Sequence, residues 1–240
     1  MARAPACVLP VHHIPRLAQH LTPHPSRLTP HLKKMNGNLF VVSAPSGAGK
    51  TSLVAALLDA DPLVRKSVSF TTRRPRPAEI NGREYNFVPV DEFERMRARG
   101  EFVESAVVHG NHYGTSHAWM GSRLAEGHDI LLEIDWQGAA QVRRVNPAAI
   151  TIFILPPSYQ ALLSRLNSRA TDPPDIIAQR LRNAREEISH LFDFDYVIIN
   201  EDFDRAAQEL AAIVVAERLK RARQTGRHQE LINQLLHPRH

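Results

Sequence analysis

Short apolar runs alternate with stretches of helical periodicity along most of the chain. Leu39–Ser43, 129–134, Ile150–Leu155 and Tyr196–Ile199 are largely apolar runs of strand length, and the short run S-V-S-F at 67–70 is predicted as a further strand. Strands that are apolar on both faces are typical of a parallel sheet covered by helices. These five runs therefore predict the strands of a central sheet.

Helical patterns follow most of these runs. We expect helices at Lys50–Ala60, 158–168, 175–191 and 202–224. Strands that alternate with helices and are joined by right-handed crossovers are typical of α/β layered folds. The pattern predicts an α/β fold with a central, mostly parallel sheet flanked by helices.

The stretch 71–125 is less regular than the segments on either side. It holds a short helical pattern near 91–99 and a strand-like run at Phe102–Val108. We expect it to be an inserted, substrate-facing subdomain between the two parts of the core, 38–70 and 126–220.

The two ends of the chain differ from this core. Residues 1–37 hold six of the 17 prolines and five of the 13 histidines, with five basic residues and no acidic one. Such a segment buries too little apolar surface to offset its chain entropy, so we expect a disordered basic extension. Residues 221–240 are expected to form a helical tail.

Charge and composition argue against two classes of partner, nucleic acids and membranes. The net charge of +5 comes from residues 1–37, because the remaining chain has 25 basic and 25 acidic residues. A nucleic-acid partner is therefore not expected. No apolar run approaches the roughly 18 residues of a membrane helix, so no membrane partner is expected. The single cysteine, Cys7, fits a reducing compartment, and we expect the cytoplasm.

A glycine-rich segment lies between the first expected strand and the first expected helix. Residues 44–51 read A-P-S-G-A-G-K-T, which matches the phosphate-binding loop G-x-x-x-x-G-K-[ST] except for alanine at its first position. Gly47 and Gly49 let the backbone approach phosphates, and the helix N-terminus favours an anion. Lys50 can reach the β- and γ-phosphates of ATP, and Thr51 can ligate Mg²⁺. The residues expected to contact ATP are Ala44, Pro45, Ser46, Gly47, Ala48, Gly49, Lys50, Thr51 and Ser52.

A second cluster of basic and hydroxyl side chains follows at 69–76, S-F-T-T-R-R-P-R. Guanidinium groups on a proline-stiffened turn suit a second phosphate-binding site. The glycine-rich loop alone leaves GTPases, ATPases and kinases open, and this cluster narrows the choice to proteins with two phosphate sites.

These motifs, taken with others in the same order, resemble the bacterial type of guanylate kinase. The matching pieces are P-S-G-A-G-K-T (45–51), S-x-x-T-R-x-P-R (69–76), N-G-x-x-Y-x-F (81–87), E-F-x-E (101–104), G-N-x-Y-G-T (110–115), L-E-I-D-W-Q-G (132–138) and R-L-x-x-R (165–169). Each piece is modest alone, but their order and spacing are specific. The resemblance implies a P-loop kinase domain at 38–220, with a GMP-binding insert at 71–125 and a mobile lid at about 166–178.

The resemblance also implies a guanine site. A carboxylate at Glu104 can accept from the N1–H and N2–H₂ donors of guanine, and the Ser69 hydroxyl can donate to O6. Adenine would leave these buried groups unpaired, so such a site rejects it. The residues implied to bind GMP are Ser69, Arg73, Arg76, Tyr85, Glu104, Tyr113, Thr115 and Asp135.

The transfer step needs no general base, because the attacking oxygen of the GMP phosphate is already anionic. The catalytic residues implied by the resemblance are the cations Lys50, Arg73, Arg165, Arg169 and Arg180. Asn200 is implied to border the adenine of ATP. Thr51, with Glu133 acting through water, is expected to hold the Mg²⁺ cofactor.

The expected function is transfer of the γ-phosphoryl of ATP to GMP and dGMP. One alternative is a related phosphotransferase such as a ribose bisphosphate kinase, which would not need Ser69 and Glu104. The other is a non-catalytic binding module, which would lack Lys50 or the lid arginines. The oligomeric state stays open, with a homo-oligomer as one option.

Overall fold

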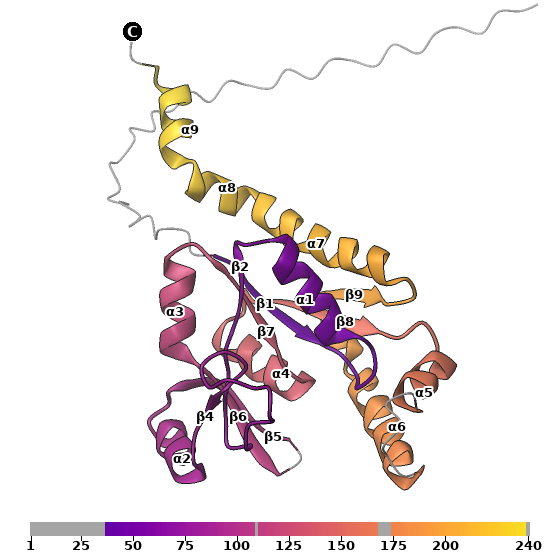
Figure 1. The fold of residues 1–240 in the computed structure, drawn as a ribbon. Helices are drawn as coiled ribbons and strands as arrows, with labels where there is room; N and C mark the ends of the chain where they lie inside the picture. Colours follow the sequence, from indigo (N-terminus) through magenta and orange to yellow (C-terminus); the bar gives the residue numbers. More distant parts are fainter. Residues whose placement is uncertain (1–36, 109, 168–173, 239–240) are drawn as a thin grey trace, which may run out of the picture. The chain divides into compact units, whose positions relative to one another are not determined.

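The computed structural model describes residues 37–108, 110–167 and 174–238. The predicted extension at 1–37 therefore lies almost wholly outside the described residues, as do Arg169 and the centre of the predicted lid. The described chain contains a five-stranded and a four-stranded sheet (Figure 1).

The five-stranded sheet is the predicted core. The prediction of a central, mostly parallel sheet is confirmed. Every neighbouring pair of strands in the sheet is in fact parallel. Its strands, in spatial order, are β2 (Val64–Lys66), β7 (Asp129–Glu133), β1 (Leu39–Ser43), β8 (Ile150–Leu155) and β9 (Tyr196–Ile199).

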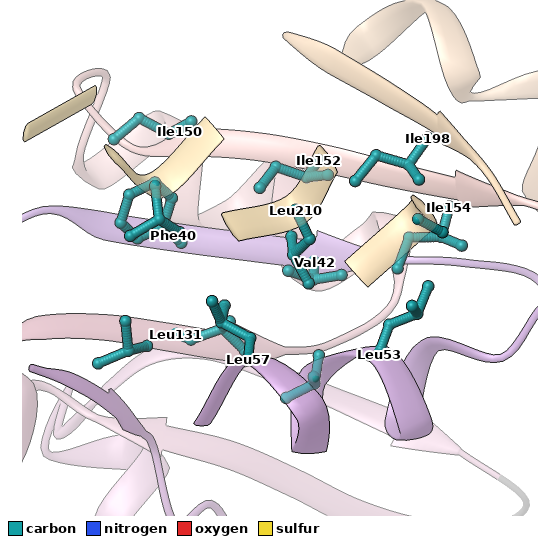
Figure 2. Close-up of a cluster of buried hydrophobic side chains, with 14 of the residues drawn as sticks. Phe40, Val42, Leu53, Leu57, Leu131, Ile150, Ile152, Ile154, Ile198 and Leu210 are labelled. Atoms are coloured by element: carbon teal, nitrogen blue, oxygen red, sulfur yellow. The ribbon is translucent and has the colours of Figure 1, made fainter. Parts of the chain in front are cut away.

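The central strand β1 buries side chains on both of its faces. Phe40 and Val42 pack with residues of α1 (Lys50–Ala60) and α7 (Phe203–Leu219), and Figure 2 shows this cluster around them. The alternate residues of β1 pack on the other face with α3 (His117–Ala125) and α4 (Trp136–Val145). Because helices cover both faces of the sheet, the strand is apolar up to its last residue, Ser43. The loop that follows β1 therefore starts from a strand that is packed on both faces.

The four-stranded sheet lies in the predicted insert at 71–125, except that its first residue along the chain is Phe70. Its spatial order is β4 (Asn86–Phe87), β3 (Phe70–Thr71), β6 (Asn111–Ser116) and β5 (Phe102–Val108). Neighbours are antiparallel except for β3 and β4, which are parallel. A short helix, α2 (Val90–Ala98), precedes β5.

The prediction of one strand at 67–70 is wrong. The chain leaves the central sheet after β2, and it enters the second sheet only at Phe70. The intervening backbone is divided between the two sheets: the N–H of Ser67 donates to the carbonyl of Leu131, and the carbonyl of Ser69 accepts from the N–H of Asn86. A four-residue pattern cannot reveal that its two ends belong to different sheets.

The helices after β8 follow the prediction with one exception, whereas α3 and α4 were not predicted. Helices α5 (Tyr159–Asn167) and α6 (Pro174–Ser189) match, and a 3₁₀ turn, η1 (Leu191–Asp193), follows them. The prediction of a single helix at 202–224 is wrong, because α7 ends where Lys220 leaves the helical conformation, with φ −53° and ψ 136°. Two further helices then form, α8 (Arg221–Arg227) and α9 (Gln229–Leu236). None of the helices in the described ranges combines the length and apolarity needed to cross a bilayer.

Candidate active site

The glycine-rich loop connects β1 to α1 with left-handed backbone at two positions. Gly47 has φ +89° and Gly49 has φ +94°, a region that disfavours residues with a Cβ. A Cβ on Gly49 would also lie 2.3 Å from Nδ2 of Asn200. The loop conformation therefore requires these glycines, and it ends at the N-terminus of α1, where an anion is favoured.

Side chains from distant elements hold this loop in place. Nδ2 of Asn200 donates to the carbonyl of Ala48 at 2.7 Å. Arg165 donates to the same carbonyl at 3.3 Å and to the carbonyl of Asn200 at 3.0 Å. Ala44, at the first position of the motif, packs against the first apolar cluster. The structure thus places Asn200 and Arg165, both predicted as substrate contacts, against the loop backbone.

The N–H of Ser46 in the loop donates to Oε2 of Glu187 at 3.3 Å. Glu187 belongs to α6 and was not a sequence candidate. Burial raises the pKa of its carboxyl group, and the bond from Ser46 and the charge of Lys50 oppose part of that rise. Arg180, a predicted catalytic residue on the same helix, is half-buried.

Lys50 and Thr51 both reach the end of β7. Nζ of Lys50 donates to the carbonyl of Ile134 at 3.2 Å, and the Thr51 hydroxyl donates to Oε1 of Glu133 at 2.6 Å. Lys66, which the sequence did not single out, donates to Oε2 of Glu133 at 2.5 Å. The sequence held no signal for Lys66, because only the pairing of β2 with β7 brings it there.

The charges in this group are strongly coupled. Burial lowers the pKa of Lys50, and the carboxylate of Glu133 is the largest influence in the opposite direction. Burial would raise the pKa of Glu133, but Lys50 and Lys66 outweigh it and hold that pKa below its ordinary value. At neutral pH, Glu133 is therefore an anion that faces Thr51.

Three of the predicted guanine-site residues come together in the second sheet. Glu104 on β5 is only 4% exposed, and its Oε1 accepts a 2.7 Å hydrogen bond from the hydroxyl of Thr115 on β6. The hydroxyl of Ser69 lies 3.4 Å from that of Thr115. Burial raises the pKa of Glu104 to about 7, Asp135 contributes to the rise, and the Thr115 bond opposes it. The group combines a buried carboxyl with two hydroxyls.

Asp135 joins this group from α4. It caps the helix, with Oδ1 accepting from the N–H of Gly138 at 2.8 Å. A Cβ on Gly138 would lie 3.1 Å from Oε2 of Glu104 and 3.4 Å from Oδ1 of Asp135. The two carboxyl groups therefore face the same glycine, which has no side chain to separate them.

Arg73 lies among aromatic side chains. Its guanidinium donates to Oε1 of Glu79 at 2.8 Å and lies 5.4 Å from the centre of the Tyr85 ring. The ring of Tyr85 meets that of Tyr113 edge-on, with centroids 5.8 Å apart. The bond to Glu79 raises the pKa of Arg73, and Tyr113 adds to the rise. The structure thus groups three of the four predicted phosphate-site residues.

Glu79 was missed in the sequence, because it lies between the motifs at 69–76 and 81–87. Its second oxygen, Oε2, accepts from the backbone N–H of Arg76 at 2.7 Å, while the Arg76 residue itself is exposed. Glu79 therefore connects both arginines of the turn. The spacing of an acid three residues after Arg76 was the only available signal.

Comparison with known proteins agrees with this arrangement. The family model described as guanylate kinase matches residues 36–217. The chain is 54% identical over 202 residues to the guanylate kinase of Methylobacillus flagellatus, covering 84% of this chain and 100% of the relative. The figures for the guanylate kinase of Dechloromonas aromatica are the same. A crystal structure of guanylate kinase from Anaplasma phagocytophilum aligns with a TM-score of 0.67 at 36% identity, covering 85% of this chain and 98% of that one.

The matched region contains the glycine-rich loop, the parallel sheet and the carboxyl groups of the second sheet. A family model that spans most of the chain and relatives that align over their full length agree with each other. On these grounds the chain belongs to the guanylate kinase family.

Proposed function

We propose that this chain transfers the γ-phosphoryl group of ATP to GMP and dGMP, giving ADP and GDP or dGDP. One observation carries the proposal: residues 133–135 contact both sites. Glu133 and the carbonyl of Ile134 bind Thr51 and Lys50 of the loop, and Asp135 faces the glycine that Glu104 also faces. A phosphate donor and a base-recognising acceptor site therefore share one strand end.

The donor site consists of the loop and the N-terminus of α1. Backbone N–H groups there favour the phosphates of ATP. Lys50 supplies a cation for charge that develops on the transferring phosphoryl group. We also assign this role to Arg165, Arg169 and Arg180, and we assign Asn200 to the ATP side because it supports the loop.

The acceptor site combines the buried carboxyl groups with the arginine cluster. Glu104 and Asp135 would accept from the guanine donors, with Ser69 and Thr115 beside them. Arg73, Arg76, Tyr85 and Tyr113 would bind the phosphate of GMP. An oxygen of that phosphate attacks the γ-phosphorus, the bond to the ADP oxygen breaks, and ADP leaves with the bonding electrons. The side chains position the reactants and neutralise charge, and none needs to remove a proton.

Mg²⁺ is the implied cofactor, and the residues present fit it. The hydroxyl of Thr51 and the carboxylate of Glu133 are oxygen donors at 2.6 Å from each other, the type of ligand that Mg²⁺ prefers. The described residues contain no group of three or more His, Cys, Asp or Glu side chains suited to a metal. This suits an ion that uses few protein ligands and is held mainly by substrate phosphates. When bound, Mg²⁺ would neutralise phosphate charge.

The single cysteine fits a reducing compartment, and we place this activity in the cytoplasm. The test is ADP release from ATP with GMP, dGMP, AMP and ribose 1,5-bisphosphate as acceptors. We expect turnover with GMP and dGMP, and its loss in Lys50→Ala. Turnover with ribose 1,5-bisphosphate alone would favour the related phosphotransferase, and no turnover would favour a binding module.

A further inference from the structure

Gln141 forms a two-bond contact that the function above does not use. It lies on α4, which packs against β5. Its Oε1 accepts from the N–H of Ser105 at 3.0 Å, and its Nε2 donates to the carbonyl of Ser105 at 3.0 Å. The side-chain amide thus pairs with the strand backbone as a neighbouring strand would.

This contact gives hydrogen-bond partners to one N–H and one carbonyl at the edge of the second sheet. β5 is an edge strand, because β6 is its only partner among the strands that the structure describes. The N–H and carbonyl of one strand residue point to the same side, so those of Ser105 point away from β6 and toward α4. Without Gln141, both groups would lose their partner at a half-buried position.

This contact lies between the two segments that carry the acidic residues of the proposed guanine site. Ser105 directly follows Glu104 on β5, and Asp135 caps the same helix that carries Gln141. The approach of Glu104 to this helix is close, since a Cβ on Gly138 would lie 3.1 Å from its Oε2. Gln141 therefore joins the element that carries Glu104 to the element that carries Asp135.

We propose that Gln141 is a positioning residue for guanine recognition: its two bonds to Ser105 set the spacing between the Glu104 and Asp135 carboxyl groups. This rests on the proposed function, because it assumes that the two carboxyl groups read the donors of guanine. Loss of the bonds lets β5 move relative to α4, and the 2-amino group of guanine is then recognised less well.

The test is Gln141→Met, which keeps the length of the side chain but removes both hydrogen bonds. Gln208→Met, at an exposed position on α7, controls for the substitution itself. Each protein is assayed with GMP and with IMP, which lacks the 2-amino group. Thermal unfolding is measured alongside.

We expect KM for GMP to rise about tenfold, the effect of losing roughly one hydrogen bond, with kcat and KM for ATP within about twofold of wild type. The ratio of kcat/KM for GMP to that for IMP should fall by a similar factor. Gln208→Met should match wild type in all these values. Gln141→Asn keeps the amide but is too short to reach, and it should reproduce the Gln141→Met pattern.

A lower melting temperature or lower kcat with unchanged KM for GMP and unchanged GMP/IMP ratio would show a merely structural role and overturn the inference. In that case the wild type still turns over GMP, and the proposed function stands. Absence of GMP turnover in the wild type would overturn both.

Discussion

The hydroxyl of Thr115 donates a 2.7 Å hydrogen bond to Oε1 of Glu104 across the β5–β6 pair. Both residues are buried, and the pKa of Glu104 is about 7, because burial opposes its ionisation more strongly than this one bond supports it. A carboxyl group that is half ionised at neutral pH has consequences for both GMP binding and stability.

The first consequence concerns GMP binding as a function of pH. Only the ionised carboxylate accepts from both N1–H and N2–H₂, so binding should strengthen as pH rises through 7. With the pKa at about 7, KM for GMP should fall about fourfold between pH 6.5 and pH 8. Steady-state kinetics at saturating ATP measure this. Glu104→Gln should show a higher KM with little pH dependence over the range, and an equal dependence in both proteins would assign it to another group.

The second consequence concerns stability. The pKa of Glu104 is higher in the folded chain than its ordinary value of 4.5, so the folded state holds the proton more tightly and loses stability as pH rises from 4.5 to 7. Glu104→Gln carries no such charge. We expect it to be more stable than wild type by about 3 kcal/mol at pH 8 and by under about 1 kcal/mol at pH 5. Urea unfolding at both pH values gives the comparison, and a difference independent of pH would contradict it.

A third prediction concerns Asn200, which is 5% exposed and donates to the carbonyl of Ala48. Asn200→Asp places an acceptor against that carbonyl, so the loop loses its support. We expect KM for ATP to rise about tenfold and stability to fall by about 1–3 kcal/mol, with KM for GMP unchanged. Asn233→Asp, on exposed α9, is the matched control. Equal changes in KM for ATP and GMP would argue against a local role at the loop.

The core strands were predictable for a physical reason. β1 and β8 are buried by helices and neighbouring strands, so their apolar runs leave little choice of structure. β6 was not predictable, because its sequence N-H-Y-G-T-S has no apolar alternation. It becomes a strand only by pairing with β3 and β5. Helices α3 and α4 were also not predicted, because each is a short amphipathic segment.

The same distinction separates the site residues that could be predicted from those that could not. Lys50 and Thr51 could be placed from the sequence, because a local strand–loop–helix order determines where they lie. Lys66 could not, because only the folding of β2 beside β7 brings it to Glu133. Glu79 could not either, because its bonds depend on how the turn that carries Arg73 and Arg76 folds back on itself. Whether Glu104 and Asp135 carry the guanine site stays a prediction that kinetics must test.

The last prediction uses the competition between two cations for Glu133. Lys66 holds Oε2 at 2.5 Å while Thr51 binds Oε1, and the Lys66 side chain is 41% exposed. Glu133→Gln removes the carboxylate charge and should raise the Mg²⁺ concentration for half-maximal activity about three- to tenfold. Lys66→Met removes a competitor and leaves the charge, so it should lower that concentration or leave it unchanged. Because the Lys66 pair is partly exposed, neither change should cost more than about 1 kcal/mol of stability through that pair. Mg²⁺ titrations at fixed ATP and GMP, repeated as Mg²⁺-dependent shifts in melting temperature with ATP, measure both effects. A rise of similar size in both variants would mean that Glu133 acts on the loop through packing rather than on the ion through charge.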